Sequence, residues 1–172
     1  LSGLRYLYYL KISDSHLPSI QNLIIPKGVT QLRLNGNRLK KYNDELGSHI
    51  NIRELYLNHN ELIEFHINQG LEELNELLLG YNQLKSFSIH ENIDKIKVLD
   101  LSSNRLKKID ERVLNLEYLE VLRVEANCID TLDITNLKSL NTLYIDADVV
   151  VKGDTTRIKD FKTFNFSQDF CS

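Results

Sequence analysis

The sequence predicts an α/β solenoid, in which short parallel strands stack in single file and each returns through an extended or short-helical segment. Two observations support this. The pattern LxxLxLxxNxL recurs every 21 to 23 residues, and within each copy apolar and polar residues alternate as in a strand with one buried face. The copies begin at Leu7, Val29, Ile52, Leu74, Ile96, Leu119, Leu140 and, more loosely, Phe161. We therefore expect one domain over residues 1–172, with about eight repeats, the first at 7–28 and the last at 161–172.

The third repeat shows how one unit is built. Leu55 and Leu57 alternate with Glu54 and Tyr56, so the leucines face inward and the polar row faces solvent. Asn60 then ends the strand, and we expect its amide to bond the backbone of neighbouring turns. The equivalent positions hold Asn37, Asn82, Asn104 and Asn127, with Ser15, Asp148 and Asp169 in the outer repeats.

The return segments differ along the chain. Pro18 and Pro26 keep the first of them extended, because proline does not continue a helix. The stretch 87–89 alternates and is expected to stay extended, whereas 110–116 has an acidic start and apolar residues at helical spacing, enough for one or two helical turns. Leucine and isoleucine should form the core, with Phe65, Phe87 and the phenylalanines of 161–170 as larger fillers.

Charge and hydropathy exclude several classes of protein. The formal net charge is -3 and no basic cluster exceeds two lysines, which argues against a nucleic-acid partner. No run of about 18 apolar residues is present, so we expect no membrane insertion. The chain has no basic and apolar leader, and it opens at Leu1 within a repeat. We therefore expect both ends to be truncated or processed.

The sequence shows no catalytic constellation. It lacks HExxH, GxGxxG, GxxxxGK[ST] and GxSxG patterns, so phosphate cradles and a nucleophile elbow are missing. His59 and His66 with Glu64 between them form the one candidate metal group, and we interpret them as surface polar residues. We therefore expect no enzyme activity, no cofactor and no metal.

The two cysteines and one sequon bear on the compartment. Cys128 follows a turn asparagine, and Cys171 falls two repeats further along the stack, about 10 Å away at the usual strand spacing. We therefore expect the two not to pair, which leaves Cys171 as a candidate for a cap disulfide or a link to another chain. Asn165 is the candidate glycosylation site of the single N-x-[ST] sequon, and Phe164 and Phe166 beside it are expected to point inward.

The exposed side of the sheet is the candidate binding surface. Its side chains have no packing role and stand on a rigid scaffold. Tyrosine and arginine, which dominate interface hot spots, lie there beside apolar residues near the centre. The residues predicted to bind a protein partner are Tyr9, Arg33, Tyr56, Leu78, Val98, Asp100, Val121, Arg123 and Tyr144. A purely architectural role, or binding through the convex loops or open ends, is the alternative.

The recurrence of apolar positions, turn asparagine and period together resembles leucine-rich-repeat proteins over essentially the whole chain. The stretch 106–146 resembles insect secreted leucine-rich immune proteins, especially the mosquito haemolymph group. The return segments 62–67 and 129–134, poor in proline, and the cysteine after the last repeat carry this likeness. Members of that group continue into a disulfide-bonded cap and coiled coil, both lacking here, and hold complement-like proteins.

That resemblance implies a secreted innate-immune recognition or complex-forming module, with a disulfide-linked or non-covalent oligomer as a further expectation. Two alternatives stay open. The 22-residue period also resembles intracellular phosphatase-regulating repeats, in which case the protein would be cytoplasmic with both cysteines reduced. Asparagine-rich turns and glycans are also typical of Toll-like receptor ectodomains, of which the chain could be a fragment.

Overall fold

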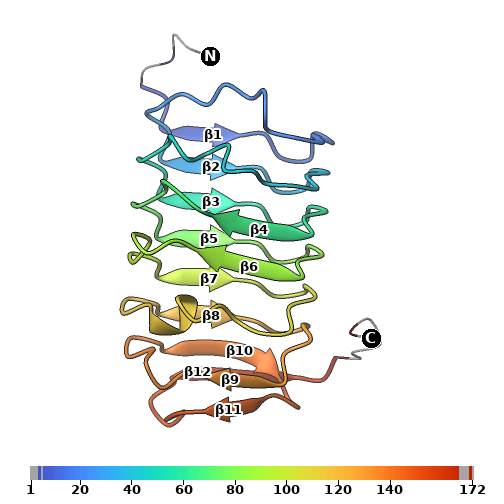
Figure 1. The fold of residues 1–172 in the computed structure, drawn as a ribbon, viewed down its shortest axis with the longest axis vertical. Coiled ribbons are helices and arrows are strands. Elements are labelled where there is room, and N and C mark those ends of the chain that lie inside the picture. The colour runs from blue at the N-terminus through green and yellow to red at the C-terminus, as the bar shows by residue number, and fades with distance from the viewer. Residues whose placement is uncertain (1–3, 5, 167–170, 172) are drawn as a thin grey trace.

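The structure, a computed structural model, describes residues 4, 6–166 and 171. Eight parallel strands form one sheet, which runs the length of the molecule, and the chain climbs from one strand to the next in order (Figure 1). These strands are β1 (Tyr9–Lys11), β2 (Gln31–Arg33), β3 (Glu54–Tyr56), β5 (Glu76–Leu78), β7 (Val98–Asp100), β8 (Val121–Arg123), β10 (Thr142–Asp146) and β12 (Asp160–Phe164). The predicted solenoid with a parallel sheet is confirmed.

The return segments are mostly extended, as predicted. They contribute two small parallel sheets, one of β4 (Glu64–Ile67) with β6 (Ser86–Ile89), the other of β9 (Thr131–Asp133) with β11 (Val150–Lys152). Within 110–116 the chain forms a short 3-10 helix, η1 (Val113–Asn115). Among residues 4, 6–166 and 171, no helix is long and apolar enough to cross a membrane.

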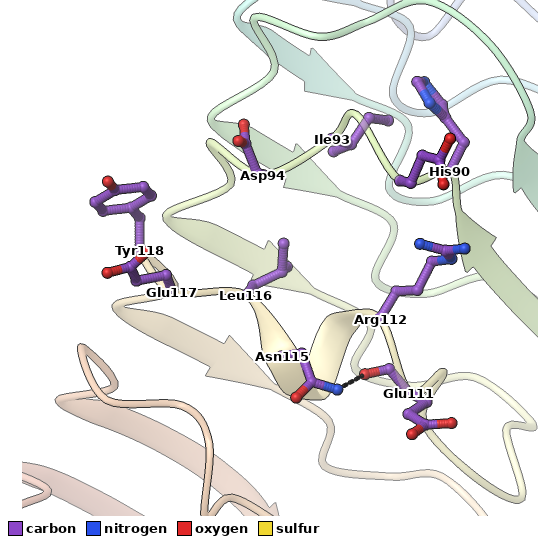
Figure 2. A pocket seen from close by; sticks show the side chains of 10 residues that line it. His90, Ile93, Asp94, Glu111, Arg112, Asn115, Leu116, Glu117 and Tyr118 are labelled. Atoms are coloured by element: carbon purple, nitrogen blue, oxygen red, sulfur yellow. Dashed lines mark hydrogen bonds between the residues drawn. The ribbon is translucent and has the colours of Figure 1, made fainter.

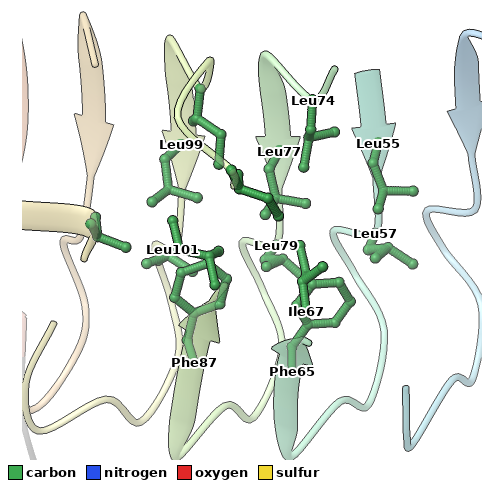
Figure 3. Close-up of a cluster of buried hydrophobic side chains, with 14 of the residues drawn as sticks. Leu55, Leu57, Phe65, Ile67, Leu74, Leu77, Leu79, Phe87, Leu99 and Leu101 are labelled. Carbon is green, nitrogen blue, oxygen red and sulfur yellow. The ribbon is translucent and has the colours of Figure 1, made fainter. Parts of the chain in front are cut away.

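The core lies between the long sheet and the return segments. Leu55, Leu77 and Leu99 from successive strands stack in line, and Phe65 and Phe87 from β4 and β6 close the core from the other side (Figure 3). The Phe65 ring also stacks on Tyr42, with ring centroids 4.4 Å apart. Each turn thus covers the apolar side of the next, which supplies the hydrophobic driving force that a single repeat lacks.

The turn asparagines form the predicted ladder. The Asn60 amide donates to the carbonyl oxygens of Leu57 (2.9 Å) and Leu34 (3.0 Å), and its oxygen accepts the Leu39 N–H at 3.1 Å. Asn37, Asn82, Asn104 and Asn127 make the same pattern. One side chain therefore satisfies backbone groups on two turns that the bend would leave unpaired.

The residue before each turn position adopts a left-handed backbone. Gly36 has φ 68°, and His59, Tyr81, Ser103 and Ala126 have φ between 52° and 57°. Non-glycine residues rarely adopt this conformation, which costs free energy. A Cβ at Gly36 would meet the Asp14 carboxylate of the preceding turn, so that side chain would have to move to admit a larger residue.

The last repeat departs from its predicted register. Phe161 pairs with Leu143 and Thr163 with Ile145, so the repeat begins at Ile158 rather than Phe161. The return through β11 is short, and aromatic residues placed three positions later imitate the core pattern. Phe161 and Phe166 are consequently exposed rather than core fillers, and Phe164 lies on the open face; Asp169 and Phe170 fall outside the described residues.

The prediction that the cysteines stay apart is wrong. Cys128 and Cys171 form a disulfide with Cα atoms 5.4 Å apart. The expected separation assumed that Cys171 stands in the strand register of an eighth repeat, but β12 ends at Phe164. Cys171 instead lies back beside the Asn127 turn, its sulfur 3.6 Å from the Asn127 carbonyl oxygen. Cys171 is therefore paired within this chain rather than with another.

Candidate functional site

The concave face is defined here as the two outward rows of the eight-stranded sheet. The first row holds Tyr9, Gln31, Glu54, Glu76, Val98, Val121, Thr142 and Asp160, and the second Lys11, Arg33, Tyr56, Leu78, Asp100, Arg123, Tyr144 and Lys162. All nine residues predicted to bind a partner lie on these rows. Lys162 takes the place expected for Asn165, which lies beyond the end of β12 and is exposed.

One end of the concave face carries a stack of rings around a cation. The Arg33 guanidinium lies 4.5 Å from the Tyr56 ring centroid and 5.8 Å from that of Tyr9. The Tyr56 hydroxyl donates to Glu54 at 2.8 Å, and the Gln31 amide donates to the same carboxylate. Burial, the Glu54 hydrogen bond and the charge of Glu76 raise the pKa of Tyr56 to about 12. Tyr56 is therefore a neutral, fixed donor at physiological pH.

The centre of the concave face is apolar. Leu78 of β5, Val98 of β7 and Val121 of β8 are half-buried neighbours, with Val98 directly opposite Val121. Neighbouring aliphatic side chains of this kind stabilise the sheet and also present apolar surface to a partner. The central patch, meaning these three residues, is continuous with the Tyr56 row through the Tyr56–Leu78 pair.

The other end holds a second cation stack. The Arg123 guanidinium donates to Glu125 at 2.5 and 3.1 Å, lies 3.8 Å from the Asp100 carboxylate, and sits 5.1 Å from the Tyr144 ring centroid. The Tyr144 hydroxyl donates to Asp160 at 2.8 Å, and the Lys162 ammonium lies 4.7 Å from the same ring. These contacts fix the long side chains, so a partner meets a surface that is already ordered.

A buried polar group lies behind this second stack. Glu125 is 4% exposed and Ser102 is 1% exposed, and Glu125 Oε2 and the Ser102 hydroxyl have no hydrogen-bond partner in the described part of the chain. Burial raises the pKa of Glu125 against the opposing effect of the Arg123 hydrogen bond. Burial tends to lower the pKa of Arg123, but the Glu125 hydrogen bond together with the charges of Asp100 and Glu125 gives a net rise.

Asp146 next to this group bonds the backbone of the Asn127 turn. Its buried carboxylate accepts the backbone N–H groups of Ala126 (2.8 Å) and Asn127 (3.2 Å). In the inner turns the equivalent N–H groups bond backbone carbonyl oxygens, so the Asp146 carboxylate takes the place of those oxygens. Asp148, at the position predicted to match the turn asparagines, is exposed.

The histidines considered as metal ligands lie on different surfaces. His59 stands in the turn and stacks on Tyr81, with ring centroids 4.4 Å apart. His66 stands in β4, with Nδ1 2.7 Å from the Ser88 hydroxyl and Nε2 3.1 Å from that of Ser86. Within the described residues, no three histidine, cysteine or carboxylate side chains form a group that could hold a metal.

A polar recess of about 600 Å³ lies beside η1. Figure 2 shows it between the His90–Asp94 segment and the helix, with Arg112 near His90 and Tyr118 at the opposite side. His90 is held by the Gly70 carbonyl oxygen at 2.7 Å. The described residues lining the recess include no serine, cysteine or lysine.

Comparison with known proteins supports the fold. Residues 94–149 match the family model for the leucine-rich repeat. A leucine-rich-repeat protein of Leptospira interrogans has 25% identity and a TM-score of 0.71, over 96% of this chain and 44% of its own. The functional domain of the Listeria monocytogenes protein InlJ, which includes a cysteine ladder, has 20% identity and a TM-score of 0.59, over 91% of this chain and 34% of its own.

The internalin InlF of Listeria monocytogenes has 18% identity and a TM-score of 0.62, over 96% of this chain and 58% of its own. No curated protein sequence matches the chain. The chain thus spans less than two thirds of these three structures. The repeat type predicted from the sequence is supported, and its resemblance to insect immune proteins stays a prediction.

Proposed function

We propose that this leucine-rich-repeat protein is a non-catalytic scaffold whose concave face holds a protein partner. The observation that carries the proposal is the half-buried central patch with a fixed arginine and tyrosine stack on either side. Apolar residues surrounded by ordered polar groups are the usual composition of a binding hot spot.

These side chains are already held in place, which favours binding. Arg33 and Arg123 are long and flexible, and ordering each on association would cost roughly 0.5–1.5 kcal/mol. Here their guanidinium groups are already stacked on Tyr56 and Tyr144, and Arg123 is also anchored by Glu125. A partner that contacts them therefore loses less free energy on binding.

We further propose that the protein acts outside the cell, as an innate-immune recognition or complex-forming module. The Cys128–Cys171 disulfide supports this, because stable disulfides form in oxidising compartments and are rare in the cytosol. It weighs against the phosphatase-regulator alternative. The exposed Asn165 suits a glycan, which also leaves a Toll-like receptor fragment as a second extracellular candidate.

The test places a charge in the central patch. Partners are first captured from the native extracellular fluid on immobilised protein and identified by mass spectrometry. The captured protein is then titrated against wild type and Leu78→Asp, for which we expect about a tenfold or greater rise in Kd because a charge would be buried in the contact. Ile63→Asp, at an exposed position in the return segment, is the matched control.

The melting temperature of each variant is measured in parallel. The proposal requires that Leu78→Asp weakens binding while the control binds as wild type does. Equal affinity of all three proteins would contradict the concave face as the binding site. A lower affinity of Leu78→Asp that is explained by a lower melting temperature of that variant would contradict it too.

A further inference from the structure

Two hollows lie along the edge of the long sheet where its middle strands begin. The first, of about 450 Å³, runs from Thr30 past Ile50 to Arg53 and Glu73. The second, of about 500 Å³, is lined by Arg53, Glu73, Asn75, Lys95, Lys97 and Tyr118. Because they share Arg53 and Glu73, the two hollows join into one groove, which we call the edge groove. It crosses the starts of successive strands from β2 to β8.

The second hollow is rich in cations. Arg53 stands just before β3, and Lys95 and Lys97 stand before β7, while Glu73 is the one carboxylate among its lining residues. The Lys95 ammonium lies 2.5 Å from Glu73, and the Lys97 ammonium lies 3.2 Å from Glu120. These four side chains are between 43% and 57% exposed. Exposed ion pairs are weak because water competes for them, so both lysines can turn to a ligand.

Arg53 is the centre of the edge groove, since it lines both hollows. Its side chain is exposed and forms no ion pair within the part of the chain that the structure describes. Its carbonyl oxygen accepts the N–H groups of Asn75 at 2.9 Å and Glu76 at 3.0 Å, which fixes the main chain beneath the guanidinium. A guanidinium binds a carboxylate through two parallel hydrogen bonds. The groove therefore favours a carboxylate at its centre.

The two ends of the edge groove are apolar. Ile50, before β3, is 60% exposed, and Tyr118, before β8, is 51% exposed. Three strand steps separate β3 from β8, which is about 14 Å at the usual strand spacing. An extended peptide advances about 3.3 Å per residue, with every second side chain on the same side. An acidic residue with an apolar residue two places before it and two places after it therefore matches the groove.

The surface beyond Tyr118 limits how far an anionic ligand can extend. Tyr118 also lines the recess beside η1, where Asp94, Glu111 and Glu117 stand (Figure 2), together with Glu91. A long polyanion, such as a sulfated glycan that followed the sheet edge, would meet these carboxylates, and like charges brought together oppose binding. A short peptide with a single acidic residue ends before it reaches them.

We propose that the edge groove binds an extended acidic segment of a protein partner. The carboxylate of that segment pairs with Arg53 and the two neighbouring lysines, Lys95 and Lys97, and its flanking apolar residues cover Ile50 and Tyr118. The cations of the groove precede the strands and do not belong to the two outward rows of the concave face. This second site therefore goes beyond the concave-face proposal and does not depend on it.

The probe is the synthetic peptide Leu-Thr-Glu-Thr-Leu with blocked ends, in which threonine favours an extended chain. It is titrated into the isotope-labelled protein, and the backbone amide shifts are followed by NMR. We expect saturable shifts at residues 50–53, 73–75, 95–97 and 118, with a Kd of about 1 mM or tighter. Glutamine in place of the glutamate should raise the Kd at least about tenfold, because the charge is lost.

Variants of the protein locate the site. Arg53→Glu and Lys97→Glu should each raise the Kd about tenfold or more, and Arg53→Lys should raise it less because the charge is kept. Lys85→Glu, at an exposed position just before β6, is the matched control for net charge. Leu78→Asp, on the concave face, should bind the peptide as wild type does. The melting temperature of each variant checks that the fold is kept.

The proposal is overturned if the peptide does not saturate the protein, or if the glutamine peptide or Arg53→Glu binds equally well. Tighter binding of a heparin oligosaccharide at the same residues would assign the groove to a glycan instead. Weaker peptide binding by Leu78→Asp would place the peptide on the concave face and would also overturn it. The captured partner tests the concave face and the peptide tests the groove, so either proposal can fail while the other holds.

Discussion

At the scale of single residues, the turn asparagine supplies N–H donors that a carboxylate lacks. Asn104 accepts the Leu84 N–H and donates to the carbonyl oxygens of Leu79 in the preceding turn and Leu101 in its own turn. Asp146 stands two residues before the turn position of its repeat, and it accepts the Ala126 and Asn127 N–H groups. The equivalent N–H groups of inner turns bond backbone carbonyl oxygens, so Asp146 replaces a backbone acceptor rather than an asparagine of the ladder.

Glu125 gives a prediction at this scale, because burial raises its pKa. Between the ordinary value of 4.5 and the raised value, the folded protein holds a proton that the unfolded chain has released. The contribution of Glu125 to the free energy of unfolding is therefore fully present below pH 4.5 and decreases as pH rises through this window. We expect Glu125→Gln to remove this part of the pH dependence.

Urea unfolding of wild type and variant across this pH range measures the difference. Relative to the variant, wild type should lose stability as pH rises above 4.5 and then level off. Glu117→Gln, at an exposed position, controls for the loss of a carboxylate. A difference between wild type and Glu125→Gln that does not change with pH would contradict the prediction.

At the scale of elements, the repeat pattern predicts strands well because each inward position has an equivalent neighbour on both sides. Leu77 pairs with Leu55 and Leu99, as the spacing of the repeats requires. The same logic fails at the repeat that contains β12. There the return through β11 is short, and Phe161 pairs with Leu143, so the true core positions precede the predicted ones by three residues.

The candidate site was predictable in position but not in its contacts. Alternation alone places Tyr56 and Arg123 on the open face, because successive side chains of a strand point to opposite sides. That Arg123 stacks on Tyr144 and bonds a buried Glu125 depends on rotamers and on the depth of the turn, which spacing does not encode. The disulfide was missed for a related reason, since Cys171 lies beside the Asn127 turn and not in the register of a repeat.

The central strands give a prediction for packing. Leu99 of β7 is fully buried between Leu77 and Leu122, so Leu99→Ala should lower the free energy of unfolding by about 2–5 kcal/mol through lost burial and a residual cavity. Leu78→Ala, on the outward side of neighbouring β5, is the matched control and should cost under about 1.5 kcal/mol, because it leaves no enclosed cavity. If chemical denaturation showed the same loss of unfolding free energy for both variants, the inward and outward sides of the sheet would not differ in burial as described.

At the scale of the whole molecule, the stack is one-dimensional and each strand of the long sheet pairs only with its neighbours in the stack. Stability then varies along the chain with the number of covered sides. At the first turn Leu10 and Ile12 are only partly buried, whereas Leu77 and Leu99 are covered from both directions. At the other end, the disulfide ties the chain after β12 back to the turn after β8.

Amide hydrogen exchange followed by mass spectrometry should resolve this gradient. We expect the lowest opening free energy at β1, the highest at β5 and β7, and an intermediate value at β10 and β12. Reducing the disulfide reopens a loop of 43 residues and removes up to about 4 kcal/mol of chain-entropy stabilisation. Because coupling passes only between neighbours, reduction should speed exchange at β10 and β12 and leave β3 and β5 unchanged. Uniform acceleration along the whole chain would instead show a single cooperative unit, and the nearest-neighbour account of this solenoid would be wrong.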